Sequence, residues 1–169
     1  MKKFELTAES KINIFGKKLF RIKALISFGD VEEGETGGWI EKEENLEQSS
    51  GNAWVYGNAE VYGNARVSGN AEVYGNAWVY GNAEVYGNAE VSGNADYTTI
   101  HGFGTQFRTT TFFQCEDKQI RVSCGCFLGT IPEFREQVKN TREGKIAEEY
   151  LMIADLMEKH FVKEKESGE

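Results

Sequence analysis

Apolar and polar positions alternate in a six-residue unit that repeats from Gly51 to Asp96. Each complete unit has the sequence Gly-Asn-Ala-x-Val followed by Tyr or Ser. Ala and Val occupy every second position, a period of two that is typical of a short strand with one buried face. Gly and Asn tolerate the positive φ angles of a tight corner, so each unit predicts one strand and one corner. Three units therefore predict one turn of a three-sided coil, with a period of eighteen residues.

The Ala and Val residues are predicted to point into this coil, and the variable residue and the Tyr or Ser to point outward. Outward positions eighteen residues apart stack on one face, as Arg66 and Glu84 do, at the strand spacing of about 4.8 Å. Outward Tyr and Trp residues are predicted to form a subunit interface, because they bury much area and keep a polar group. These interface candidates are Trp54, Tyr56, Tyr62, Tyr74, Trp78, Tyr80 and Tyr86. Stacking of exposed strand formers on one another would explain the same residues without a partner.

Residues 1–38 are predicted to form an N-terminal β cap. Apolar and polar residues alternate over residues 20–26 and Gly16 supplies a turn, which together predict a β-hairpin. Ile40 and Leu46 keep the six-residue spacing of the valines, but they lie three residues out of phase with the repeat. An irregular first coil is typical of the ends of repeat folds, where the exposed core needs a cap.

The coil is predicted to cover residues 39–103, because Tyr97 and Phe103 continue the six-residue phase of the valines. Residues 104–169 are predicted to form a C-terminal segment. It begins with strand-forming residues that predict a β-hairpin over residues 107–123.

Two helices are predicted at the end of the chain. Thr130 and Glu133 have the spacing of a capping box, which predicts a helix that ends near Asn140. A second helix over residues 145–161 carries an apolar stripe at helical spacing. The stripe residues are Ile146, Tyr150, Ile153, Met157 and Phe161. This stripe is expected to pack on the coil end, on the first helix or on the same helix of another subunit.

The repeat resembles that of a known group of proteins. The unbroken spacing of Ala and Val is similar to the hexapeptide repeat of the bacterial transferases, which implies a mainly β fold built on a left-handed parallel β-helix. The leader FGDVEEGETGGWIEKEENL, the GNAxVYGNA array and the tail RVSCGCFLGTIPEF resemble a family of phage and prophage proteins of unassigned role. The resemblance implies a phage setting and no particular chemistry.

Charge is distributed unevenly along the chain, whose formal net charge is −8. Residues 1–29 hold seven basic and two acidic residues, whereas residues 30–96 hold two basic and thirteen acidic residues. The acidic coil disfavours binding to a nucleic acid backbone and suits a basic protein surface. Solvated acidic side chains would also keep an exposed coil soluble without any partner.

The composition predicts a cytoplasmic protein. The chain has no run of eighteen apolar residues, which predicts no membrane span, and the first ten residues lack an apolar signal core. Three cysteines without a pairing pattern suit a reducing compartment, here the host cytoplasm if the chain is phage-encoded.

His101 is the one candidate catalytic base. The acyltransferases of the resembled fold use a coil histidine, and the repeat from Gly51 to Asp96 contains none. The γ-class carbonic anhydrases of that fold need three zinc-bound histidines, whereas this chain has only His101 and His160. His160 is expected on the surface or in the packing of the second helix. The chain is therefore expected to be no enzyme and to use no cofactor.

Two further candidate sites lie after the coil. Cys115, Cys124 and Cys126 are candidate zinc ligands together with His101, although Cys-Gly-Cys lacks the usual two-residue spacing. Buried thiols at alternate strand positions explain the cysteines without a metal. Candidate anion contacts are Arg108, Thr109, Thr110, Thr111 and Arg121. A solvated hairpin face explains these five residues equally.

Three functions follow as hypotheses. The first is a non-enzymatic interaction protein that forms a homo-oligomer, with a trimer favoured, and binds a host macromolecule, for instance to interfere with a host defence. The second is an oligomeric sponge that sequesters a small nucleotide-like ligand. The third is an acyltransferase that uses His101.

Overall fold

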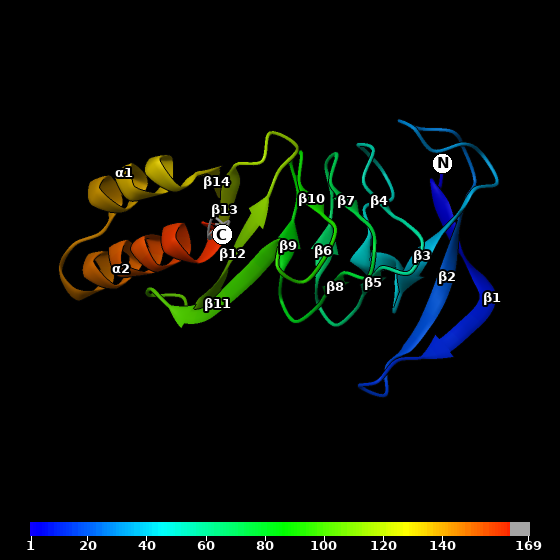
Figure 1. Ribbon diagram of the computed structural model, residues 1–169, viewed down its shortest axis with the longest axis horizontal. Helices are drawn as coiled ribbons and strands as arrows, with labels where there is room; N and C mark the ends of the chain where they lie inside the picture. The colour runs from blue at the N-terminus through cyan, green and yellow to red at the C-terminus, as the bar shows by residue number, and fades with distance from the viewer. Residues whose placement is uncertain (163–169) are drawn as a thin grey trace, which may run out of the picture.

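Short parallel strands of the repeat stack into three ladders at the centre of the molecule (Figure 1). The computed structural model describes residues 1–162. A strand pairs with the strand eighteen residues further along the chain, as Val55 pairs with Val73, which confirms the predicted period. The first ladder contains β4, β7 and β10, the second β5 and β8, and the third β6 and β9. The bounds are β4 (Trp54–Val55), β5 (Glu60–Val61), β6 (Arg66–Val67), β7 (Glu72–Val73), β8 (Trp78–Val79), β9 (Glu84–Val85) and β10 (Glu90–Val91).

Alanine and valine fill the interior of the coil. The valines from Val55 to Val91 are fully buried, and so are the alanines from Ala53 to Ala83, while Ala89 is 1 % exposed. The truncated last unit departs from the pattern, because Ala95 is exposed. The chain leaves the coil there to enter the C-terminal sheet.

Glycine alone makes the corners. The glycines that open the units from Gly51 to Gly87 have φ between 56° and 67°. A Cβ atom on Gly51 would lie 2.1 Å from the carbonyl oxygen of Gly69 in the next coil, so this corner requires glycine for space as well as for φ. The neighbouring asparagines form a column instead, in which Asn64 Nδ2 donates to Asn82 Oδ1 at 3.3 Å.

An antiparallel hairpin caps the N-terminal end of the coil. It consists of β1 (Phe4–Ile12) and β2 (Lys18–Ala24), as the alternating pattern predicts. Strand β3 (Thr36–Ile40) pairs antiparallel with β2 and parallel with β5, and so joins the cap to the second ladder.

The three-residue phase shift is confirmed by the pairing of the first coil. Ile40 pairs with Val61, and Leu46, which follows the short helix η1 (Glu43–Asn45), forms a parallel bridge with Val67. Both pairs are twenty-one residues apart, three more than the period of the repeat.

A four-stranded antiparallel sheet covers the C-terminal end of the coil. Its strands are β11 (Tyr97–Phe103), β12 (Arg108–Gln114), β13 (Ile120–Cys124) and β14 (Phe127–Thr130), in that order. The predicted hairpin is confirmed as β12 and β13. The predicted coil boundary at residue 103 is wrong, because Tyr97 to Phe103 form a sheet strand that pairs with β12. Phe113 packs into the coil core and Phe112 packs on the opposite side of the sheet.

Two helices cover the outer face of this sheet, as Figure 1 shows. Helix α1 (Ile131–Thr141) begins with the predicted capping box of Thr130 and Glu133, and α2 (Gly144–Phe161) follows. The apolar stripe of α2 packs on α1 and on the sheet within one chain, where Ile153 is 5 % exposed. Of the three expected partners of this stripe, the first helix is therefore confirmed, and the same helix of another subunit is not the one that buries it. No helix within residues 1–162 is long and apolar enough to cross a membrane.

Candidate interaction surface

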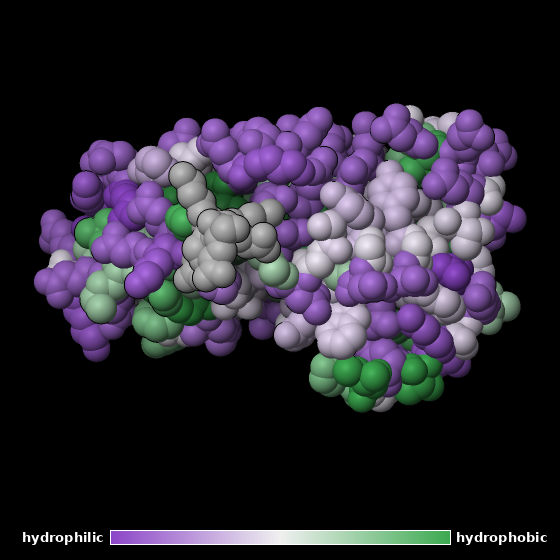
Figure 2. All heavy atoms as spheres, viewed as in Figure 1, coloured by the Kyte–Doolittle hydropathy of each residue, from purple (hydrophilic) through white to green (hydrophobic). Residues whose placement is uncertain are grey.

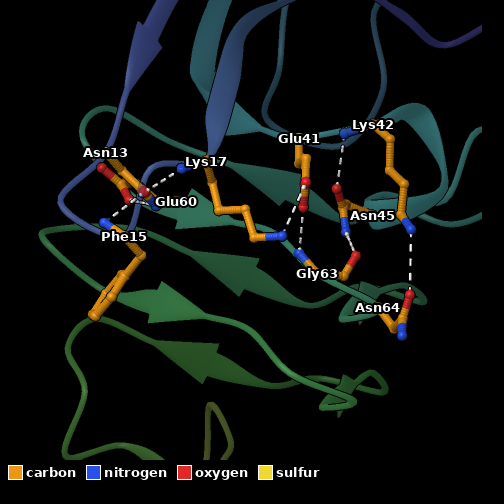
Figure 3. Close-up of polar contacts among 9 residues, drawn as sticks. All are labelled: Asn13, Phe15, Lys17, Glu41, Lys42, Asn45, Glu60, Gly63 and Asn64. Carbon is orange, nitrogen blue, oxygen red and sulfur yellow. Dashed lines mark hydrogen bonds and ion pairs between the residues drawn. The ribbon is translucent and has the colours of Figure 1, made fainter.

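The tip of the β1–β2 hairpin, residues 11–18, lies along the second ladder of the coil and is called the hairpin arm below. Asn13 builds its turn, because its Oδ1 accepts hydrogen bonds of 3.0 Å from the backbone N–H groups of Phe15 and Lys17. Asn13 Nδ2 also donates to Glu60 Oε2 at 3.3 Å, which ties the turn to β5 (Figure 3).

Two glutamates anchor the arm by charge: Glu60 of β5 and Glu41, which follows β3. Lys11 Nζ lies 2.8 Å from Glu60 Oε1, and the Glu60 residue is 8 % exposed. Lys17 Nζ lies 3.6 Å from Glu41 Oε1, while the other oxygen of Glu41 accepts from the Gly63 N–H at 2.7 Å. Each carboxylate therefore has two partners, and Figure 3 shows Glu41 between Lys17 and Gly63.

Asn45 fixes the irregular first coil below the arm. Its side chain is fully buried, accepts from the Lys42 N–H at 2.9 Å and donates to the carbonyl oxygen of Ala65 at 2.9 Å. Lys42 Nζ donates to Asn64 Oδ1 at 3.3 Å, which joins this coil to the asparagine column (Figure 3).

Aromatic rings stack along the face that the arm covers. The rings of Tyr62 and Tyr80 lie 5.4 Å apart with an angle of 8° between their planes. Phe15 contacts both rings and meets Trp78 edge-on at a centroid distance of 5.7 Å. Burial beneath the arm, together with the neighbouring Tyr80 and Glu60, raises the pKa of Tyr62 to about 12.

The prediction that all seven coil aromatics are outward interface residues is wrong for two of them. Trp54 is fully buried, because the rings of Phe4 and Phe28 pack against it edge-on at 6.2 and 5.4 Å. Tyr62 is 5 % exposed beneath the hairpin arm. Of the other five coil aromatics, four are half-buried and one, Tyr80, is exposed. The half-buried residues are Tyr56, Tyr74, Trp78 and Tyr86.

A patch of exposed apolar side chains surrounds the end of the arm. Its members, called the tip patch below, are Ile12, Ile14, Phe15 and Tyr80. Ile14 is 77 % exposed and Phe15 is 59 % exposed. Figure 2 shows a hydrophobic patch at the lower edge of the molecule, where Figure 1 places the turn between β1 and β2. Sequence reasoning predicted Tyr80 as an interface residue but not the other three. The signal for them was the run Ile-Asn-Ile-Phe before Gly16, which places apolar residues at a turn that does not require them.

A concave surface lies between the last coil and the C-terminal sheet. This C-terminal cleft has a volume of about 630 Å³. Tyr86 and Leu128 supply its apolar walls, and Glu116, Asp117 and Glu133 supply carboxylates. Its residues come from the corner after β9, the β12–β13 turn, β13, β14 and the start of α1.

The five candidate anion contacts do not converge. Arg121 lines the cleft, but its guanidinium lies 2.6 Å from Asp117 Oδ2. Thr110 and Thr111 are buried on opposite faces of β12, where Thr110 donates to Cys124 Sγ and Thr111 Oγ1 accepts from the Glu84 N–H. The anion-site prediction is therefore wrong for Thr110 and Thr111.

Arg108 and Thr109 lie at the other end of β12 from the cleft. His101 is exposed on β11, and its Nδ1 lies 2.8 Å from Thr109 Oγ1. His160 is exposed on α2 beside Phe161.

The three cysteines also lie apart. Cys115 is buried against the coil at Ala89, and this burial raises the pKa of its thiol to about 11. Cys124 is the last residue of β13, at the end of the strand away from Cys115. Cys126 is exposed in the turn that follows β13. Within residues 1–162, no group of three His, Cys, Asp or Glu residues is placed to hold a metal ion.

Within residues 1–162, the tip patch and the C-terminal cleft are thus two surfaces that offer contacts to a partner or a ligand. Comparison with protein-family models and with curated proteins finds no match to this chain.

Proposed function

We propose that this protein is a non-enzymatic interaction protein of phage or prophage type. It forms a homo-oligomer, with a trimer expected, and binds a host macromolecule in the host cytoplasm. The tip patch carries this proposal, because four large apolar side chains gather there in contact with water.

The rigidity of the arm supports an interface in preference to a loose loop. The turn is hydrogen-bonded by Asn13, and the Glu60 and Glu41 carboxylates hold the arm on the coil. A surface fixed before binding loses little conformational entropy when a partner docks. Exposed aromatic and aliphatic side chains on such a support are typical of binding energy concentrated in few residues.

A left-handed parallel β-helix is the scaffold that we propose for this surface. The eighteen-residue pairing and the glycine corners support a β-helix, and the hand rests on the resemblance to the hexapeptide proteins. Because each coil contacts only its neighbours, such a scaffold supports a binding surface on one face without a large globular core.

The experiment is affinity capture from host cells with a matched pair of variants. Phe15→Ser removes the central ring of the tip patch, whereas Phe107→Ser removes a ring that is 67 % exposed in the β11–β12 turn. We expect Phe15→Ser to abolish recovery of a partner and Phe107→Ser to retain it. Equal recovery with both variants would exclude the tip patch as the binding surface.

The C-terminal cleft favours ligand sequestration as a second candidate function. Its volume of about 630 Å³ lies in the range of small-molecule sites. Its carboxylates disfavour phosphate and suit a ligand with hydrogen-bond donors or a positive charge. Mass spectrometry of protein purified without denaturation tests this function, which requires a small molecule bound in a fixed ratio.

A further inference from the structure

We propose that the hairpin arm of one copy docks into the C-terminal cleft of the next copy, so that copies associate head to tail. This inference rests on the self-association that the proposed function includes. It adds the two surfaces that meet, and it makes the contact heterologous, with a different patch contributed by each copy. An arm that is docked in a neighbouring copy is not free to bind a host macromolecule, so the two contacts of the tip patch are mutually exclusive.

The arm offers apolar groups and positive charge together. Ile14 and Phe15 lie in its turn and are 77 % and 59 % exposed, and Lys18 follows them at the start of β2. Lys18 is exposed and takes part in no ion pair within residues 1–162. Its Nζ lies 5.4 Å from the ring centroid of Phe20, and no carboxylate there neutralises its charge.

The cleft offers the complementary groups. Leu128 is 40 % exposed and forms an apolar wall with the Tyr86 ring. Glu116 is exposed at the rim, and its side chain makes no ion pair within the described part of the chain. The one cation of the cleft, Arg121, is already neutralised by Asp117 at 2.6 Å. The free charge of the cleft is therefore negative.

The two surfaces cannot meet within one chain. Figure 1 shows the turn of the arm beside the coil near β5 and β8, where Phe15 contacts Trp78, whereas the cleft-forming strands β13 and β14 lie beyond the C-terminal end of the coil. Two arms placed tip to tip would bring Lys17 and Lys18 of both copies together, which disfavours a symmetric contact between identical patches. A contact between the arm of one copy and the cleft of the next pairs apolar side chains with apolar side chains and Lys18 with Glu116. Repetition of this contact gives a closed ring or an open filament.

A charge exchange tests the contact in the full-length protein. We expect Lys18→Glu and Glu116→Lys each to weaken association by about tenfold or more, because each places like charges opposite one another. The double variant Lys18→Glu, Glu116→Lys should restore the wild-type dissociation constant. Both positions are exposed, and circular dichroism checks that each variant folds. Failure of the double variant to regain association would overturn the inference.

Mixing two inactive variants tests the direction of the contact. Phe15→Ser keeps an intact cleft, and Leu128→Asp keeps an intact arm. Each variant alone should be monomeric by light scattering. Their mixture should give a dimer of one copy of each, with twice the chain mass of 19.0 kDa, because the defective surfaces prevent further growth. A mixture that stays monomeric contradicts head-to-tail docking.

Failure of this inference is distinguishable from failure of the proposed function. A wild-type chain that is monomeric at about 100 µM but captures a host partner through Phe15 overturns the head-to-tail contact and leaves partner binding intact. Head-to-tail association without any captured partner supports the contact and contradicts the partner-binding role.

Discussion

Lys3 Nζ donates a hydrogen bond of 3.1 Å to the carbonyl oxygen of Ala53, inside the N-terminal cap. Ala53 stands at the start of the regular repeat, so no earlier regular coil supplies a backbone N–H to this carbonyl. The ammonium group fills that role, and it also lies 4.7 Å from the ring centroid of Phe28. Burial lowers the pKa of Lys3 to about 8 from its ordinary value near 10.5, against the opposing charge of Glu47.

We predict that Lys3 makes the protein more stable as pH rises from about 8 toward 10.5. In this window the unfolded lysine keeps its proton and the folded lysine loses it, so stability rises with pH. The free energy of unfolding, measured by urea titration at several pH values, should rise in wild type relative to Lys3→Met. Lys2→Met, at an exposed lysine, is the control and should follow wild type. A Lys3→Met profile parallel to wild type would contradict a buried, titrating amine.

Removal of eighteen residues should be tolerated better than removal of six. Deletion of residues 63–80 brings the next units onto the same faces, whereas deletion of residues 75–80 rotates everything after them by one face. Both deletions remove Trp78 and Tyr80, so loss of the contacts with Phe15 is matched. We expect a cooperative thermal transition for the longer deletion only, and equal melting temperatures would contradict a three-sided period.

Substitutions at two neighbouring coil positions should differ sharply in how much they lower the free energy of unfolding. Val73→Asp places an unpaired carboxylate in the fully buried interior and should destabilise the protein by about 4 kcal/mol or more. Glu72→Lys, one residue earlier, should change stability by less than about 1 kcal/mol. The pKa of Glu72 is raised by partial burial, with further contributions from Glu90 and Asp30, so removal of its charge relieves repulsion. Chemical denaturation measures both effects.

The hairpin arm should detach when its carboxylate anchor is neutralised. Glu60→Gln weakens the contacts with Lys11 and Asn13, and it should increase tryptic cleavage at Lys17 and Lys18 severalfold without a large fall in melting temperature. Glu84→Gln is the matched control, because Glu84 has the same place in its repeat unit but is exposed. Unchanged cleavage in Glu60→Gln would show that the contacts of Glu60 are not needed to hold the arm.

Local pattern predicted the elements well where neighbouring residues determine the structure. The repeat predicted the ladders, the spacing of Ile40 and Leu46 predicted the irregular first coil, and Thr130 with Glu133 predicted the start of α1. In each case the determining residues lie within a few positions of one another, so period and capping chemistry are sufficient.

Burial of individual outward side chains could not be predicted in the same way. Trp54 occupies an outward strand position, yet it is buried by Phe4, which lies fifty residues earlier in the chain. Arg121 was a candidate contact, but its grouping with Tyr86, Glu116 and Leu128 in one C-terminal cleft could not be predicted, because these residues come from separate elements. Such surfaces arise from packing between distant segments, which periodicity does not encode.

The hairpin arm braces the coil mechanically on one face. Hydrogen bonds between coils run along the axis of the stack, and Phe15 bridges two successive coils by touching Tyr62 and Tyr80. Within the described residues, the arm covers only the second ladder. The coil therefore resists bending unequally in different directions. A lateral force should therefore bend the coil most easily in the direction that separates the strands of the first and third ladders. The molecule thus has a preferred bending direction.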